Sequence, residues 1–319
     1  MASLELLRRL AGSFWIRAVV SVGLLAAVAT QIDFGLIRSR LSGGSWGWFV
    51  LAVVVLFASF VVGGLRWQIF LHAAGIDTTP SASVRAYLIG TFTTNFLPTQ
   101  IGGDLTRVFV AAGPGLRIRA GVTVFLDRAS ALACMLAVGW LLIALNPEPI
   151  PGQLFAGIAS ASAAFVVVVI VALVLERLGV TRRLVPVRAR PHALEIRNAL
   201  AACLTRPVLA KTLLIGLGFQ GLVYLAAWLV ARSISLDTPF AVIGAVMAPV
   251  LILSTAPVSI GGYGVREGSY VLLLGYAGVG ATEAALFSLL QGMAFTLASL
   301  PGALVLLRRP RGAPSAVSR

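Results

Sequence analysis

Long apolar segments separated by short polar ones dominate the hydropathy pattern of this chain. Six of these segments are continuous and long enough for a helix to cross about 30 Å of hydrocarbon. They are Phe14–Thr30, Trp46–Gly63, Arg119–Leu145, Leu154–Leu175, Lys211–Ala231 and Glu283–Leu307. Their apolar residues are continuous rather than alternating, which favours helices over the strands of a β-barrel. The pattern predicts an all-α, polytopic integral membrane protein, with residues 1–319 forming one membrane domain.

Two further apolar segments, residues 86–112 and 240–277, are interrupted by helix-breaking residues. The breaks lie at Pro98 with Gly102-Gly103 and at Pro257 with Gly261-Gly262. Proline removes a backbone donor and paired glycines favour non-helical backbone, so each segment divides into two pieces too short to span. We therefore expect two re-entrant helical hairpins in addition to about six full spans. For the first segment, two short full spans would satisfy the same topology.

The two breaks share one motif, Pro-x-x-Ile-Gly-Gly-x-x-x-Arg, at residues 98–107 and 257–266. Counting spans from a cytoplasmic start puts the first copy on the cytoplasmic side and the second on the external side. Such opposed broken helices are typical of an inverted repeat around an alternating-access site. The halves are expected at residues 1–145 and 154–308.

Charge supports this topology. Charged residues make up only 11% of the chain, 59% is hydrophobic and the mean hydropathy is +0.97, a balance that excludes an ordinary soluble domain. The net charge of +14 comes from arginines beside helix ends, in the start of the chain, the loop 176–211 and the tail 309–319. The positive-inside tendency makes all three cytoplasmic, as in a multi-pass protein of a bacterial-type inner membrane. Nucleic acid is not expected as a partner; anionic lipid headgroups at the loop are an alternative use of the charge.

The two motifs suggest an anion site. Unpaired amides at a restarted helix attract anions, and an arginine about one turn further on adds a formal charge. The expected substrate-binding residues are Arg107, Arg266, Gly102, Gly103, Gly261 and Gly262, with Asn95 as a polar liner. The alternative is that each motif is a tight turn and each arginine extends to the membrane interface.

Other ionisable residues lie within or beside apolar segments, where charges are expensive and usually functional. Asp127 and Arg128 fall inside a predicted span, and they could equally form a local structural pair. Asp104 lies near Arg107 in the sequence, and Glu267 is adjacent to Arg266. Either acid could neutralise its arginine or couple transport to a proton or cation. We assign these four, Asp104, Asp127, Arg128 and Glu267, to coupling or tuning.

Together these residues resemble a known family. Arg66-Trp67, Asn95-Phe96-Leu97-Pro98, Gly102-Gly103-Asp104 with Arg107, Asp127-Arg128, and residues 257–267 are similar to the lysylphosphatidylglycerol synthase transmembrane-region family, also called flippase-like. The resemblance covers roughly residues 10–308. It implies lipid translocation and adds Arg66 to the substrate-binding residues. In the namesakes a cytosolic aminoacyl-transferase domain is attached; we expect none here.

The predicted function is therefore translocation of an anionic phospholipid, a glycolipid or a polyprenyl-phosphate-linked lipid, with its headgroup in a central cleft. We expect no enzyme activity, metal or cofactor: His72 and His192 are far apart, and Asp-x-Asp and Cys-x-x-Cys clusters are absent from the sequence. Two alternatives stay open: a membrane enzyme or accessory protein of lipid or lipid-linked sugar synthesis, and a non-transporting scaffold. Besides the lipid, two partners stay open: a second copy of this chain and a lipid-biosynthetic enzyme.

Overall fold

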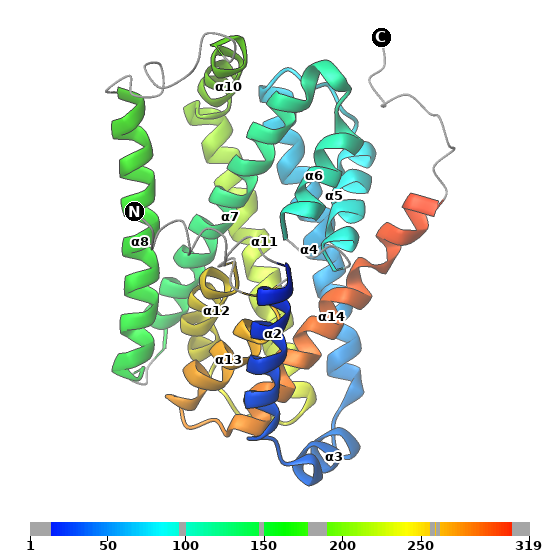
Figure 1. The fold of residues 1–319 in the computed structure, drawn as a ribbon, viewed down its shortest axis with the longest axis vertical. Helices are drawn as coiled ribbons and strands as arrows, with labels where there is room; N and C mark the ends of the chain where they lie inside the picture. The colour runs from blue at the N-terminus through cyan, green and yellow to red at the C-terminus, as the bar shows by residue number, and fades with distance from the viewer. Residues whose placement is uncertain are drawn as a thin grey trace.

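The protein is a bundle of helices. The computed structural model describes residues 14–95, 100–146, 150–177, 190–255, 259 and 262–307. Twelve α-helices and a short 3₁₀ turn at Pro114–Leu116 make up the regular structure of these residues (Figure 1). The helices are α2 (Phe14–Ala29), α3 (Phe34–Ser42), α4 (Trp46–Ala73), α5 (Pro80–Thr94), α6 (Gln100–Ala111), α7 (Arg117–Ala144), α8 (Gly152–Arg177), α10 (Arg190–Cys203), α11 (Arg206–Ser233), α12 (Phe240–Thr255), α13 (Val265–Gly275) and α14 (Ala281–Leu307).

Within the described residues, five helices are long and apolar enough to cross a membrane, or six spans if α2 and α3 are counted as one bent span. Five of the six predicted spans are thus confirmed. These are α4, α7 with the turn before it, the first 20 residues of α8, α11, and α14. The sixth predicted span, Phe14–Thr30, forms α2, which has 16 residues. It is followed by α3 at a bend of 78°. The bend has a local cause, because the Asp33 side chain accepts hydrogen bonds from the amides of Gly35 and Leu36 and so starts a new helix.

Both interrupted segments form pairs of short helices, α5 with α6 and α12 with α13 (Figure 1). The four helices have 15, 12, 16 and 11 residues. Figure 1 shows the first pair in the upper half of the bundle and the second pair in the lower half. Pro98, Pro257 and Gly261 lie outside the described residues, as do the tail 309–319 and residues 178–189 of the basic loop. The predicted interruption of both segments is confirmed.

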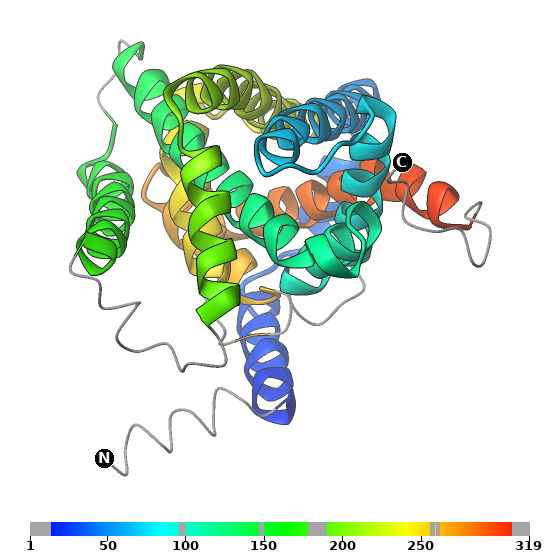
Figure 2. The ribbon, with the colours of Figure 1, turned by 90° about the horizontal axis from the view of Figure 1, so that it is seen from above.

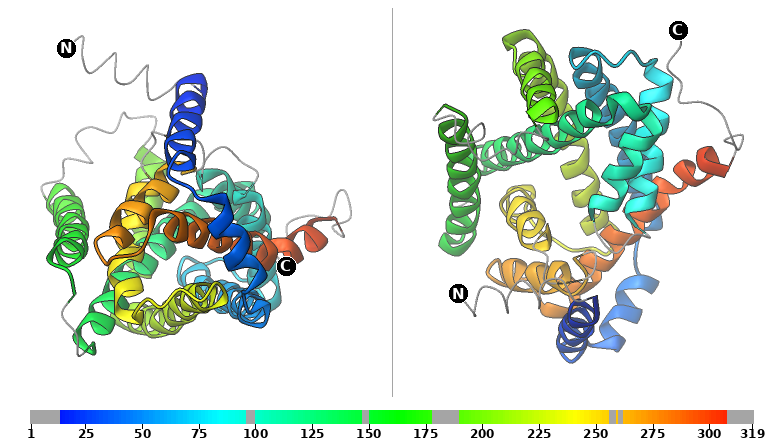
Figure 3. Two further views of the ribbon diagram at one scale, coloured as in Figure 1. Left: turned by 90° about the horizontal axis from the view of Figure 1, so that it is seen from below. Right: turned by 45° about the horizontal axis from the view of Figure 1, so that its top comes forward.

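Small residues allow the helices to approach closely. A side chain at Gly64 of α4 would contact the backbone of Val84 in α5, and one at Gly302 of α14 would meet the carbonyl of Leu88. Figures 1 and 3 show α14 running from beside α13 past α5. It therefore packs against one helix from each short pair.

The periphery is apolar. Residues 166–171 of α8 are all exposed, and Figure 2 shows α8 and α2 at the outside of the bundle. An exposed run of this kind is suited to lipid rather than to water. The amphipathic α10 lies within the predicted basic loop 176–211 and is held to α7 by an ion pair between Arg119 and Glu195, 3.2 Å apart.

Candidate functional site

Three buried charged side chains meet between α4, α6 and α7. Arg66 donates from Nε and Nη2 to Oδ1 of Asp127, at 3.1 and 2.7 Å, and Nη2 also reaches the main-chain oxygen of Asp127 at 3.2 Å. Arg107 donates from Nη2 to Oδ2 of the same carboxylate at 2.9 Å. Arg66, Asp127 and Arg107 are 0%, 1% and 3% exposed. One carboxylate thus bridges two guanidinium groups in the interior.

Aromatic rings form the walls around this bridge. The Arg107 guanidinium lies over the rings of Trp67 and Tyr87, 4.3 and 4.4 Å from their centroids. The Arg66 guanidinium lies 4.9 Å from the Phe219 ring centroid. Rings at these distances stabilise a cation that water does not reach. None of these three rings was predicted as a site residue.

A second ion pair extends the cluster outward. Arg128 donates from Nε and Nη2 to the carboxylate of Asp104, with three N–O distances between 2.9 and 3.2 Å. Asp104 also lies 3.6 Å from Nη1 of Arg107, which connects the pair to the buried bridge. The side chain of Arg128 is 49% exposed and that of Asp104 is 21% exposed. The cluster therefore runs from the interior to the outside of the bundle.

The charges of this five-residue cluster do not cancel. Three guanidinium groups, of Arg66, Arg107 and Arg128, face two carboxylates, of Asp104 and Asp127. Within the described residues, Nη1 of Arg66 and Nε of Arg107 are buried without a hydrogen-bond partner. One positive charge and two donors are thus left over, a combination that is costly unless an anion satisfies it.

The second motif forms a smaller cluster. Arg266 donates to Oε1 of Glu267 from Nε and Nη2, at 3.0 and 2.6 Å. The other oxygen of Glu267 accepts from the amide of Gly264 at 2.7 Å and so caps α13. The Arg266 side chain is 31% exposed and that of Glu267 is 2% exposed. Glu267 therefore caps α13 and also pairs with Arg266. Of the two roles expected for it, neutralising its arginine and coupling transport, the ion pair matches the first.

One face of α14 brings Asn95, at the end of α5, and Arg266, in the second motif, to neighbouring turns. A side chain at Gly292 would collide with the Arg266 guanidinium, 2.7 Å away. One turn later Thr296 donates to Asn95 at 3.4 Å, and Asn95 donates to Ser299 at 2.9 Å. Asn95 is the residue at the end of α5, directly before the first break. The contacts of Arg266 at Gly292 and of Asn95 at Thr296 are thus about 6 Å apart along α14, at 1.5 Å per residue.

The glycine pairs do not have the same role in the two motifs. Gly102 and Gly103 lie inside α6, and Gly102 is in its first turn, where amides have no partner within the helix. Gly262 lies in a turn with φ of +83°, before α13 begins at Val265. Arg107 is consequently two turns into its helix, whereas Arg266 is the second residue of its own. The expected single turn between break and arginine holds for neither copy, because α6 starts before its glycines and α13 after them.

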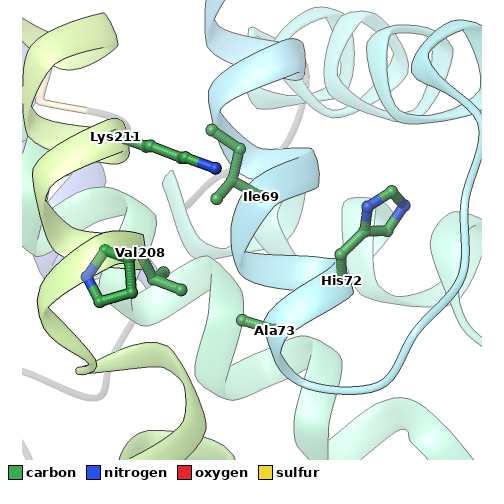
Figure 4. Close-up of a pocket in the computed structure, with 6 residues that line it drawn as sticks. Ile69, His72, Ala73, Val208 and Lys211 are labelled. Carbon is green, nitrogen blue, oxygen red and sulfur yellow. The ribbon is translucent and has the colours of Figure 1, made fainter.

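Cys203 and one surface pocket lie apart from these clusters. Burial raises the pKa of the Cys203 thiol to about 11, so it is a neutral thiol at physiological pH. A pocket between the ends of α4 and α11 is lined by Ile69, His72, Ala73, Pro207, Val208 and Lys211. Figure 4 shows the Lys211 side chain extending from α11 toward Ile69. No predicted site residue lines it.

Comparison with protein-family models matches residues 14–302 to a family described as the lysylphosphatidylglycerol synthase TM region. The chain belongs to this family. The region that matches the lysylphosphatidylglycerol synthase TM region includes both motifs, the five-residue cluster and the Arg266–Glu267 pair. Comparisons with curated proteins and with solved structures give no match. The membership confirms a polytopic membrane protein of the flippase-like kind.

Proposed function

We propose that this protein is a lipid translocator that moves an anionic phospholipid, glycolipid or polyprenyl-phosphate-linked lipid between leaflets. The observation that carries the proposal is the five-residue cluster, with its surplus positive charge and its half-exposed arginine inside membrane-spanning helices. Ionisable groups at such positions usually mark a substrate pathway. The headgroup would pass through the bundle while the acyl chains stay in the bilayer.

The proposal includes an inverted repeat, an architecture that alternating-access transporters use. Helices α4 to α7 have 28, 15, 12 and 28 residues, and α11 to α14 have 28, 16, 11 and 27. The helices also pack reciprocally, because α5 contacts α14 and α12 contacts α7. In this proposal the two series are equivalent halves with opposite orientation in the membrane.

The connections after α4 and α11 support the same relation. In each, a residue with positive φ ends the helix, Gly75 at +76° and Ser235 at +53°. The next amide bonds back to a carbonyl five residues earlier, from Ile76 to Leu71 at 2.9 Å and from Leu236 to Ala231 at 3.0 Å. Asp-Thr follows in both connections. This likeness lies outside the Pro-x-x-Ile-Gly-Gly-x-x-x-Arg motif and is independent of it.

With the arginine-rich loop in the cytoplasm, α5 and α6 enter and leave from the cytoplasmic side, and α12 and α13 from the external side. Both termini are then cytoplasmic, in a bacterial-type inner membrane. In this arrangement Arg107 and Arg128 would bind the headgroup beside the first re-entrant pair, and Arg266 would bind it beside the second. The face of α14 between Gly292 and Ser299 connects them.

Leaflet exchange in proteoliposomes tests the proposal. Vesicles containing the purified protein are expected to exchange headgroup-labelled phosphatidylglycerol at least tenfold faster than protein-free vesicles, and faster than labelled phosphatidylcholine. Mass spectrometry of the recovered lipid is expected to show unaltered phosphatidylglycerol. A chemically modified lipid would instead favour the enzyme alternative, and equal exchange with and without protein would favour a scaffold.

A further inference from the structure

The Asp104–Arg128 ion pair is where the buried cluster reaches the outer surface. Large apolar side chains near it in the sequence are exposed on the same two helices: Leu105 and Phe109 of α6 are 52% and 53% exposed, and Phe125 of α7 is 67% exposed. Such a surface is made for acyl chains. The pair is thus a charged site among exposed apolar side chains that would otherwise contact lipid.

The position of Arg128 along α7 is unusual for a charged residue. Arg128 lies eleven residues into α7, which begins at Arg117, so it is about 16 Å from that end of the helix at 1.5 Å per residue. α7 has 28 residues, so Arg128 lies near the middle of a helix that is long enough to cross about 30 Å of hydrocarbon. A half-exposed arginine there is too deep to reach the interface, and a charge at this depth usually marks a substrate path.

The geometry of the pair is that of phosphate recognition. Nε of Arg128 is 3.1 Å from one carboxylate oxygen of Asp104, and Nη2 is 2.9 Å from the other. Nη1 of Arg107 approaches the same carboxylate at 3.6 Å. A phosphodiester presents two equivalent oxygens and one negative charge, and an arginine fork binds it in the same way as a carboxylate.

The charge balance indicates a monoanion. The carboxylate of Asp127 is occupied by Arg66 and Arg107, one on each oxygen. Asp104 is three residues before Arg107 on α6, so its carboxylate stays beside the cluster even when it is not paired. The cluster then carries one positive charge, which a single phosphodiester would neutralise. A second negative charge would leave the cluster anionic in a medium of low dielectric constant.

We propose that Asp104 is a tethered substitute for the lipid phosphate, and that a singly charged phosphodiester headgroup displaces it from Arg128 and Arg107. This inference rests on the proposed translocation and adds the substrate class and the first ligands. Asp104 holds the two arginines in place when no lipid is bound. It returns to Arg128 when the headgroup leaves, and so it limits affinity and allows release.

The test is lipid binding by the purified protein in detergent, followed as the rise of the thermal unfolding midpoint with added phosphatidylglycerol. Asp104→Asn removes the competing charge, so half-saturation is expected at about tenfold lower phosphatidylglycerol concentration than in the wild type. Arg128→Gln is expected to raise that concentration at least tenfold. The matched controls are Glu195→Gln and Arg119→Gln, because that pair is 22% and 43% exposed, close to the 21% and 49% of Asp104 and Arg128. Both controls are expected to bind like the wild type.

If the ion pair is purely structural, Asp104→Asn and Arg128→Gln will both be less stable, and Asp104→Asn will not bind phosphatidylglycerol more tightly. That result would overturn the proposal. Dimethyl phosphate, a soluble phosphodiester, separates the headgroup of a lipid from a free anion. Saturation by dimethyl phosphate at the same concentration as by phosphatidylglycerol would contradict a lipid site. Leaflet exchange by the wild type, measured in parallel, separates the two proposals: exchange without the affinity gain refutes only the role of Asp104, and the affinity gain without exchange refutes only translocation.

Discussion

Replacing Asp127 with asparagine is expected to destabilise the protein by about 3 to 5 kcal/mol, because it leaves two buried guanidinium groups without their shared carboxylate. Arg66 and Arg107 are both less than 5% exposed, so water cannot take the place of the carboxylate. The measurement is the thermal unfolding midpoint in detergent, which is expected to fall by on the order of 10 °C.

Asp237 offers the control for this substitution. It pairs with Arg232 at 3.6 Å but is fully exposed, so Asp237→Asn is expected to leave the unfolding midpoint unchanged. Asp127→Glu keeps the charge with a longer side chain and is expected to fall between the two. If Asp127→Asn unfolded at the same temperature as Asp237→Asn, the buried bridge would not be holding α4, α6 and α7 together.

Replacing Gly103 with alanine is the second substitution with a large expected effect. A Cβ atom there would lie 1.9 Å from Oγ1 of Thr94 and 2.4 Å from the carbonyl oxygen of Gly90, so α5 and α6 must move apart. Overpacking of this kind typically costs about 1 to 3 kcal/mol. Because α6 carries Asp104 and Arg107, the same movement is expected to reduce leaflet exchange of phosphatidylglycerol at least tenfold.

Gly121 of α7 is the matched control, since a Cβ atom there meets nothing within 4 Å. Gly121→Ala is expected to be neutral or slightly stabilising, because alanine favours a helix over glycine by about 1 kcal/mol. The comparison therefore separates close packing from helix propensity. Equal unfolding midpoints and equal exchange rates for the two variants would show that the crossing of α5 and α6 tolerates a methyl group.

The spans and the broken segments could be predicted because they depend on local properties. A continuous apolar run can satisfy lipid only as a helix, and proline with paired glycines interrupts it. The bend after α2 was missed, although Asp33 carried a signal: it is an N-cap residue directly before Phe34. The predicted span ended at Thr30, before this cap, and the helix that begins after the cap was not predicted.

The candidate site was predicted in its members but not in its pairing. Arg107 and Asp127 were predicted from their positions within apolar segments, and Arg66 only from the family resemblance. Nothing local connects Arg66 with Asp127, 61 residues away. The sequence favoured Asp104 as the partner of Arg107, and the structure adds Asp127 at 2.9 Å. Trp67 was noted only as part of the family resemblance, and Tyr87 gave no signal, because an aromatic ring that faces a cation looks like any other apolar residue in a membrane helix.

The most direct test of the account is whether the second motif takes part in the same transport as the first. We would measure exchange of labelled phosphatidylglycerol by Arg266→Gln, with Arg40→Gln as the control, since Arg40 is 33% exposed and pairs with Glu283 as Arg266, 31% exposed, pairs with Glu267. At least a tenfold loss of exchange is expected for Arg266→Gln, with its unfolding midpoint close to that of Arg40→Gln and with exchange by the control retained. Undiminished exchange by a folded Arg266→Gln protein would contradict a translocation path shared by the two motifs.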